Sequence, residues 1–132
     1  MSTTILMKAS HMATVLVIDD EAPIVELLVD IIEDEGHTVL QANNGMEGLT
    51  LAREKQPDLI ISDIMMPLLD GYAFLRELRA DTSIAHIQVI LMSAAFPLGH
   101  LGNGTSDEFQ ADGYLHKPFE LNTIEDILDE LN

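Results

Sequence analysis

The feature that most constrains the fold is an alternation of short apolar runs with longer segments of helical periodicity. The first run, Thr14 to Ile18, is almost wholly apolar and ends abruptly at Asp19-Asp20-Glu21. This pattern is typical of a strand buried on both faces. Pro23 then favours a first helical turn, apolar residues recur at helical spacing, and Gly36 supplies a stop. Residues 14–36 therefore predict a strand followed by a helix.

The same alternation continues along the chain. Further strands are predicted at 38–42, 59–61, 89–92 and 114–115. Further helices are predicted from Met46 to before Pro57, at 72–80 and at 121–131. Parallel neighbouring strands need crossover connections, and helices supply them, so this order indicates a parallel sheet covered by helices on both faces. The sequence thus predicts an α/β fold of about five strand-helix units.

The stretch between Ala95 and Gly113 departs from this pattern. It contains one proline and several glycines: Pro97, Gly99, Gly102 and Gly104. A helix interior loses about 1 kcal/mol for each glycine and about 3 kcal/mol for a proline. We therefore expect a mobile loop through Gly104, with any helix confined to about residues 106–111. The fourth helix of the fold is expected to be short or irregular.

Composition excludes several classes of function. The chain has 132 residues, no cysteine, and 23 acidic against six basic side chains, for a formal charge of −17. One domain of this length can bury a core without a disulfide or structural metal. Without cysteine, zinc-thiolate sites, disulfides and thiol catalysis are ruled out. Because phosphate backbones and anionic lipids repel such a charge, we expect no direct binding of nucleic acid or membrane.

The first residues are interpreted as a leader. Ser10-His11-Met12 is typical of a cloning scar, and the residues before it lack the pattern of an export signal. We assign residues 1–12 to an expression-tag-like leader and 13–132 to the functional domain. Because no apolar run approaches the roughly 20 residues of a membrane-spanning helix, we expect a cytoplasmic protein.

Polar residues stand where the predicted strands end. From the first strand to the last they are Asp19, Asp20, Asp63, Ser93 and Lys117. Ligands of open parallel sheets bind outside the carboxyl ends of the strands, so we expect these side chains to converge on one edge. Clustered carboxylates repel one another unless a cation lies among them, and oxygen ligands without histidine or cysteine favour Mg²⁺. An aspartate beside Mg²⁺ can attack phosphorus to form an acyl phosphate, while a lysine neutralises charge on the phosphoryl oxygens.

Each residue also has a simpler explanation. An aspartate at a strand end is often a helix cap. Ser93 alone is more often a turn hydroxyl, and Lys117 alone is most often a solvated surface charge. Tyr114 would ordinarily be a half-buried strand aromatic. Only the combination points to phosphoryl chemistry.

Four segments resemble the motifs of the receiver domains of two-component response regulators, in the family's order and at similar intervals. They are the first strand with its acidic pair, the phosphoacceptor segment, the hydroxyl motif and the lysine motif: Val15–Glu21, Asp63–Gly71, Leu91–Ala95 and Tyr114–Phe119. The resemblance covers residues 13–132, the predicted receiver domain. It implies a CheY-like, flavodoxin-like fold, a doubly wound sheet of five parallel strands in the order 2-1-3-4-5 surrounded by about five helices.

The same resemblance implies the chemistry of the site. Asp63 would accept a phosphoryl group from the phosphohistidine of a sensor histidine kinase or phosphotransfer protein. Asp20, Asp63 and the backbone carbonyl of Met65 would bind Mg²⁺, and Asp19 would assist mostly through water. The chain would not be a conventional enzyme, although self-catalysed phosphotransfer to Asp63 and autodephosphorylation are expected.

The resemblance further implies how the signal is passed on. The phosphoryl-binding and switch residues would be Ser93, the Ala94 backbone, Lys117 and Tyr114. The hydroxyl and the aromatic ring would move on phosphorylation and remodel the face formed by the fourth helix, fifth strand and fifth helix. Gly71 and Pro118 would have structural roles, and Pro118 restricts the backbone of Lys117. The signal would reach a partner or an output domain, and dimerisation on activation stays open.

Two other functions use part of the same pattern. A Mg²⁺-dependent phosphatase with an aspartyl-phosphate intermediate would need the same nucleophile, ion and lysine. It usually also needs an acid two residues after the nucleophile, where this chain has Met65. The second alternative is a receiver that docks partners without being phosphorylated, against which the complete set of phosphorylation residues argues.

Overall fold

A computed structural model describes residues 12–66, 69–93 and 111–130. The elements in chain order are β1 (Thr14–Ile18), α2 (Ala22–Asp34), β2 (Thr38–Ala42), α3 (Gly45–Lys55), β3 (Leu59–Asp63), α4 (Gly71–Ala80), β4 (Gln88–Ser93), β5 (Gly113–His116) and α6 (Leu121–Asp129). Within these residues, no helix combines the length and the apolar character needed to cross a membrane.

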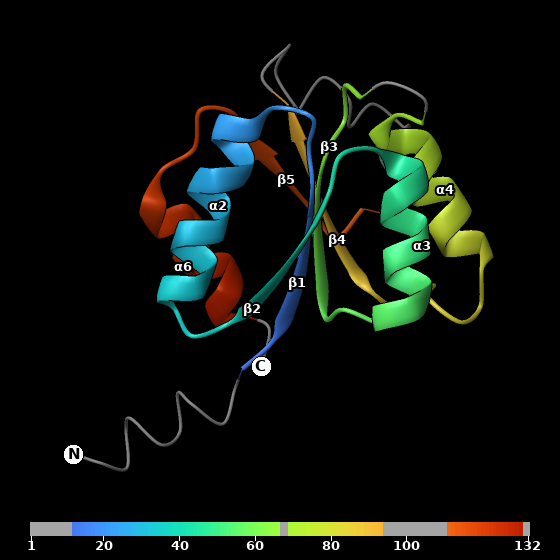
Figure 1. The fold of residues 1–132 in the computed structure, drawn as a ribbon, viewed down its shortest axis with the longest axis horizontal. Helices are drawn as coiled ribbons and strands as arrows, with labels where there is room; N and C mark the ends of the chain where they lie inside the picture. The colour runs from blue at the N-terminus through green and yellow to red at the C-terminus, as the bar shows by residue number, and fades with distance from the viewer. Residues whose placement is uncertain (1–11, 67–68, 94–110, 131–132) are drawn as a thin grey trace.

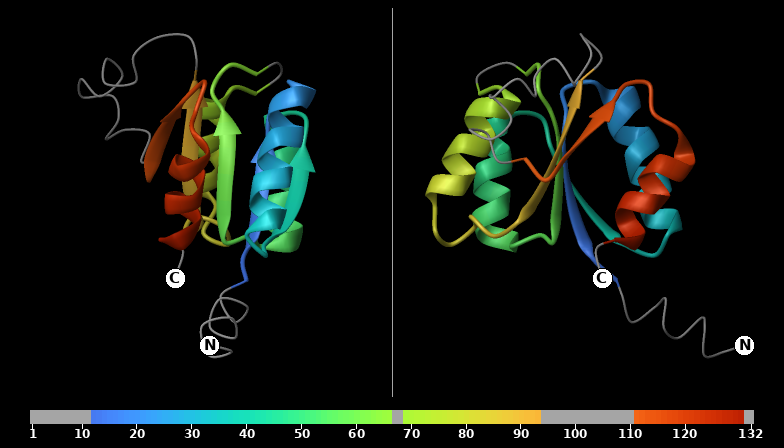
Figure 2. Two further views of the ribbon diagram at one scale, coloured as in Figure 1. Left: turned by 90° about the vertical axis from the view of Figure 1, so that its left-hand side faces the viewer. Right: turned by 180° about the vertical axis from the view of Figure 1, so that it is seen from behind.

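The strands form one parallel sheet with the order β2-β1-β3-β4-β5. Helices α2 and α6 cover one face of the sheet, and α3 and α4 cover the other (Figure 1 and Figure 2). This arrangement confirms the predicted doubly wound α/β fold and its strand order. The described part of the chain contains four helices where about five were expected.

Two hydrophobic cores lie on the two faces of the sheet. Because successive strand side chains point to opposite faces, β1 sends Leu16 and Ile18 into the core under α3 and α4, and Val15 and Val17 into the core under α2 and α6. All four side chains are fully buried. At roughly 1.5–3 kcal/mol for each buried aliphatic side chain, this double burial explains why the strand is apolar from Val15 to Ile18.

The helix starts follow capping chemistry. The side chain of Asn44 accepts a hydrogen bond from the Glu47 amide at the start of α3, and Asp70 accepts one from the Ala73 amide at the start of α4, both at 2.9 Å. Because Asp70 caps the helix, α4 begins at Gly71, one residue before the predicted start at Tyr72.

Two leucines in the helical apolar pattern are exposed. Leu27 on α2 is 47% exposed, and Leu121 on α6 is 55% exposed. The side chains that α2 buries are Val25, Leu28, Ile31 and Ile32. A periodic pattern identifies a helix, but the position of the neighbouring elements decides which side of the pattern is covered.

Some sequence predictions concern residues that lie outside the described ranges. These are the leader up to residue 11, the loop and short helix expected between residues 95 and 111, and the Ala94 backbone.

Candidate phosphoacceptor site

The predicted functional residues lie at the edge of the sheet where the strands end. Asp19 directly follows β1, Asp63 is the last residue of β3, Ser93 is the last residue of β4, and Lys117 directly follows β5. In Figure 2 the strand arrowheads point toward this edge. The parallel topology therefore brings together residues that are up to 98 positions apart in sequence.

Three aspartates form a compact group of oxygen ligands. One carboxylate oxygen from each of Asp19, Asp20 and Asp63 lies within 4.8 Å of the others. Asp19 and Asp63 are buried, whereas Asp20 is exposed and borders a hollow of about 140 Å³. The group is thus anchored on its inner side and open to solvent on its outer side. Its spacing and its all-oxygen chemistry fit a hard divalent cation such as Mg²⁺.

The ammonium of Lys117 is buried beside these carboxylates. Its Nζ atom lies 2.8 Å from Asp19 Oδ2, 3.1 Å from Glu21 Oε1 and 3.5 Å from Asp63 Oδ1. The Lys117 side chain is only 7% exposed. The structure therefore excludes the simpler explanation that this lysine is a solvated surface charge.

The electrostatics of the site come from burial and from these close charges. Burial and the negative charge of Asp19 raise the pKa of the Asp63 carboxyl, while Lys117 and the backbone amide of Met65 act to lower it. Burial alone would lower the pKa of Lys117, but hydrogen bonds to Asp19 and Glu21, with the charges of Asp19 and Asp63, raise it. A cation among the three aspartates would relieve the repulsion between Asp19 and Asp63.

Asp19 does not cap α2, contrary to the simpler explanation for an acid at this position. The N-cap residue of α2 is Glu21. The carboxylate of Asp19 instead accepts the backbone N–H of Glu21 at its Oδ1 atom, 2.9 Å away, and the ammonium of Lys117 at its Oδ2 atom. Each oxygen of this buried carboxylate thus has a partner of its own.

Glu21 is a site residue that sequence reasoning overlooked. Its carboxylate hydrogen-bonds to Lys117 although its side chain is 60% exposed. The available signal was its position directly after the Asp19-Asp20 pair. An exposed acid next to other acids has no feature that separates it from a solvated charge, so the contact became visible only in the fold.

The backbone around Asp63 depends on Gly71. The Gly71 amide donates a hydrogen bond to the Ile64 carbonyl at 2.9 Å. A Cβ atom at position 71 would lie 2.6 Å from the Asp63 carbonyl oxygen, closer than real Cβ contacts allow. This close approach explains the structural role predicted for the glycine. Nearby, the peptide bond between Lys117 and Pro118 is cis.

The predicted switch residues occupy neighbouring strands. Ser93 is fully buried, and its carbonyl accepts the backbone N–H of Lys117 at 2.9 Å. Tyr114 packs with Tyr72 against the core under α3 and α4. Its hydroxyl is buried without a hydrogen-bond partner among the described residues, and burial raises its pKa. The structure therefore places Ser93 beside the backbone of Lys117 and Tyr114 against the core under α3 and α4. Their switching roles and the Met65 carbonyl as a ligand stay predictions.

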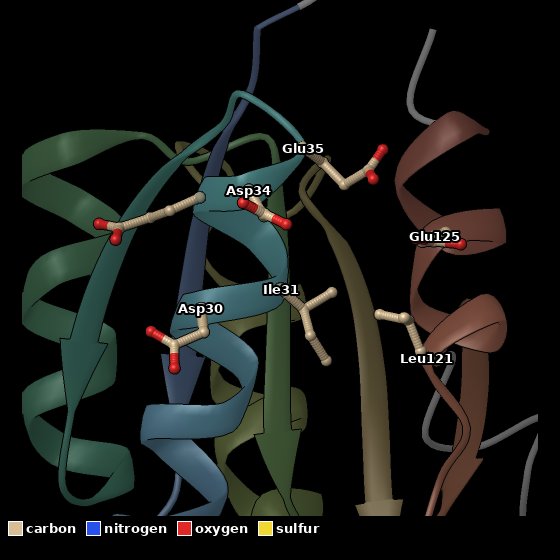
Figure 3. Close-up of a pocket in the computed structure, with 7 residues that line it drawn as sticks. Asp30, Ile31, Asp34, Glu35, Leu121 and Glu125 are labelled. Carbon is tan, nitrogen blue, oxygen red and sulfur yellow. The ribbon is translucent and has the colours of Figure 1, made fainter.

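A second hollow, of about 540 Å³, lies between α2 and α6 (Figure 3). Its lining consists of five carboxylates and two aliphatic side chains: Asp30, Glu33, Asp34, Glu35, Glu125, Ile31 and Leu121. None of these lining residues is basic or carries a hydroxyl. The hollow therefore lacks the lysine and hydroxyl found at the edge of the sheet, and we place the candidate site at that edge.

Comparison with known proteins identifies the family. The family model of the response regulator receiver domain matches residues 15–129. The chain is a response regulator receiver domain. It therefore belongs to a two-component system, and its fold is the CheY-like fold of that family.

Relatives and solved structures agree with this assignment. The receiver domain is 38% identical over 115 residues to the DNA-binding dual master transcriptional regulator RpaA of a Synechocystis species. The match covers 83% of this chain and 45% of RpaA. The chain thus spans less than half the length of that curated relative. Its fold matches the chemotaxis response regulator CheY4 of Vibrio cholerae with a TM-score of 0.82 at 27% identity, covering 92% of this chain and 99% of CheY4.

A further match is the receiver domain of the Francisella response regulator 1452. It has a TM-score of 0.80 and 31% identity, and the match covers 90% of this chain and 95% of the Francisella domain.

Proposed function

We propose that this receiver domain accepts a phosphoryl group on Asp63 and uses the phosphorylated form as a signal. The observation that carries the proposal is the convergence of three aspartates, with oxygens within 4.8 Å of one another, beside the buried ammonium of Lys117. A carboxylate nucleophile, a cation site and a fixed lysine are the groups that phosphoryl transfer to an aspartate requires.

The transfer begins with a carboxylate oxygen of Asp63 attacking the phosphorus of a phosphohistidine. The new O–P bond makes an acyl phosphate as the N–P bond breaks, and the leaving imidazole keeps the bonding electrons. The donor would be a sensor histidine kinase or a phosphotransfer protein. Lys117, 3.5 Å from Asp63 Oδ1, is placed to neutralise the phosphoryl oxygens.

The residues that would hold Mg²⁺ are Asp20, Asp63 and the Met65 carbonyl, with Asp19 assisting. The ion, when bound, would supply positive charge that offsets both the carboxylates and the transferred group. Asp20 is the exposed member of the aspartate group. Its carboxylate can therefore bind the ion without breaking a buried ion pair. Asp19 already has both oxygens engaged, by Lys117 and by the Glu21 amide. This engagement supports its assisting role.

The domain would act as a stoichiometric acceptor and not as a conventional enzyme. The acyl phosphate would be lost by attack of water on phosphorus, which breaks the O–P bond, releases inorganic phosphate and restores the Asp63 carboxylate. The residue two positions after Asp63 is the exposed Met65, whose thioether cannot protonate a leaving group. The lack of an acid at position 65 disfavours the phosphatase alternative.

Phosphorylation would move the side chains of Ser93 and Tyr114, and the changed surface would be recognised by a partner or an output domain. Ser93 is buried beside the backbone of Lys117, and Tyr114 is three residues before that lysine on β5. RpaA, the relative of which this chain matches 45%, is a DNA-binding transcriptional regulator. Control of transcription through another domain is therefore the output class that the comparison supports.

Intact-mass measurement after incubation with acetyl phosphate tests the proposal. One phosphoryl group should be added in the presence of Mg²⁺ and very little without it, and Asp63→Asn should stay unlabelled. Labelling of Asp63→Asn equal to that of the wild type would overturn the assignment. An unlabelled wild type whose fold is intact would instead favour the docking module that works without phosphorylation.

A further inference from the structure

Glu21 contacts the site without being one of its expected members. We propose that Glu21 is a positioning residue that holds the ammonium of Lys117 in the resting protein and releases it when Asp63 is phosphorylated. This inference rests on the proposed function, because it concerns the regulation of the same site. It predicts that the charge of Glu21 disfavours the phosphorylated form.

The first support is the unusual use of the N-cap position. Serine, threonine, aspartate and asparagine are preferred there because their side chains accept a backbone N–H of the first turn. Glu21 is the N-cap residue of α2, yet its side chain makes no capping hydrogen bond. It instead accepts a hydrogen bond from Lys117 Nζ at 3.1 Å. The side chain therefore serves the site and not the helix end.

The second support is that Glu21 is held in place by the site itself. Its backbone N–H donates to Asp19 Oδ1 at 2.9 Å, while Asp19 Oδ2 accepts from Lys117 at 2.8 Å. Asp19 thus links the backbone of Glu21 to the ammonium that the Glu21 side chain binds. This closed arrangement fixes the contact across the junctions of β1 with α2 and of β5 with α6.

The third support is the difference in burial among the three partners of Lys117. The side chain of Asp19 is 0% exposed and that of Asp63 is 7% exposed, whereas that of Glu21 is 60% exposed. An ammonium has three N–H donors, and here each faces a carboxylate. A phosphoryl group on Asp63 adds acceptor oxygens. A second N–H of Lys117 can donate to these oxygens only if the ammonium breaks its contact with Asp19 or Glu21.

Glu21 is the carboxylate that can be given up most easily. Water solvates its exposed carboxylate once it is released, whereas releasing buried Asp19 would leave a charge without a partner. Exposed ion pairs contribute about 0.2–1 kcal/mol, so removing the Glu21 charge should favour a phosphoryl-like ligand by roughly 1.4-fold to fivefold.

The experiment compares Glu21→Gln with Glu33→Gln. Glu33 is also exposed on α2, gives the same change of charge and shape, and does not border the hollow beside Asp19 and Asp20. It forms no ion pair with Lys117 within the described ranges. Beryllofluoride with Mg²⁺ serves as the phosphoryl analogue, and its binding is followed by amide chemical shifts. We expect Glu21→Gln to bind it about 1.4-fold to fivefold more tightly and Glu33→Gln to match the wild type.

A measurement without metal or analogue tests the resting contact directly. The ¹⁵N resonance of the Lys117 ammonium should shift in Glu21→Gln and stay in place in Glu33→Gln, with the backbone spectrum otherwise unchanged. An unchanged Lys117 resonance in Glu21→Gln, or equal analogue affinities of the two variants, would overturn the role of Glu21. A wild type that binds no beryllofluoride would count against the proposed function, and the ammonium resonance would still report on the contact.

Discussion

A Cβ atom on Gly71 would lie 2.6 Å from the backbone carbonyl oxygen of Asp63 and 2.8 Å from the Cα atom of Ile64. The start of α4 therefore presses directly on the strand end that carries the candidate phosphoacceptor. Both clashes are with backbone, which cannot swing aside as the end of a side chain can. The placement of Asp63 thus depends on a residue eight positions later in the chain.

We predict that Gly71→Ala destabilises the domain and impairs phosphorylation together. Alanine should favour a helix, but forced backbone movement of this kind costs about 1–3 kcal/mol. Urea unfolding should show this loss, and acetyl phosphate labelling of the folded variant should be slower. Gly113→Ala is the control, since its Cβ would meet only the flexible end of Ile90, at 2.9 Å. Equal losses in the two variants would contradict the role assigned to Gly71.

Lys117→Met should raise the pKa of the Asp63 carboxyl further, because burial and Asp19 already raise it and Lys117 is a group that lowers it. The folded pKa then lies further above the unfolded value of about 3.9. Stability should consequently fall as pH rises from the unfolded value through the folded one. Carboxyl ¹³C shifts of Asp63 measure the pKa, and urea unfolding across the same pH range measures stability.

The same variant tests the balance between the lysine and the metal. Removing one partner of a buried ion pair costs about 3–5 kcal/mol, and Mg²⁺ should restore part of this because binding to the folded state stabilises it. Exposed Lys55→Met is the matched control and should change little. If Mg²⁺ stabilised neither the wild type nor Lys117→Met, the aspartate group would not be a site where the ion binds. Equal stabilisation of the two proteins would show that the ion does not replace the charge of Lys117.

Asp81 provides a pH prediction away from the site. Hydrogen bonds from the side chain of Arg53 and from Ser83 lower its pKa to about 2. A lowered folded pKa means that the contribution to stability is present above the unfolded value, near 3.9, and is lost as pH falls toward 2. An NMR titration should place the Asp81 midpoint near 2, and Arg53→Gln should move it upward. A midpoint unaffected by Arg53→Gln would show that the 2.8 Å contact is not made in solution.

The sequence alone was sufficient for the fold class and for most strands. The β1 and β2 ranges, Thr14–Ile18 and Thr38–Ala42, coincide with the predicted ones. For β1, burial on both faces requires an apolar run, and such a run can be recognised without neighbours. β2 lies at the edge of the sheet and is only partly buried, so it tolerates polar residues such as Gln41. The convergence of Asp63 with Lys117 also followed from sequence, because parallel strands end at one edge whatever their side chains.

Contacts between elements were decided only by the tertiary structure. In the sequence, nothing distinguishes Glu21 from the other acids among the 23 acidic residues. Its contact with Lys117 forms because the β1–α2 and β5–α6 loops meet at the edge of the sheet. The clash that reserves position 71 for glycine likewise depends on how closely α4 approaches β3. Apolar patterns record what each segment buries and are therefore local. Distances between side chains on different elements depend on packing, which no single segment of the sequence encodes.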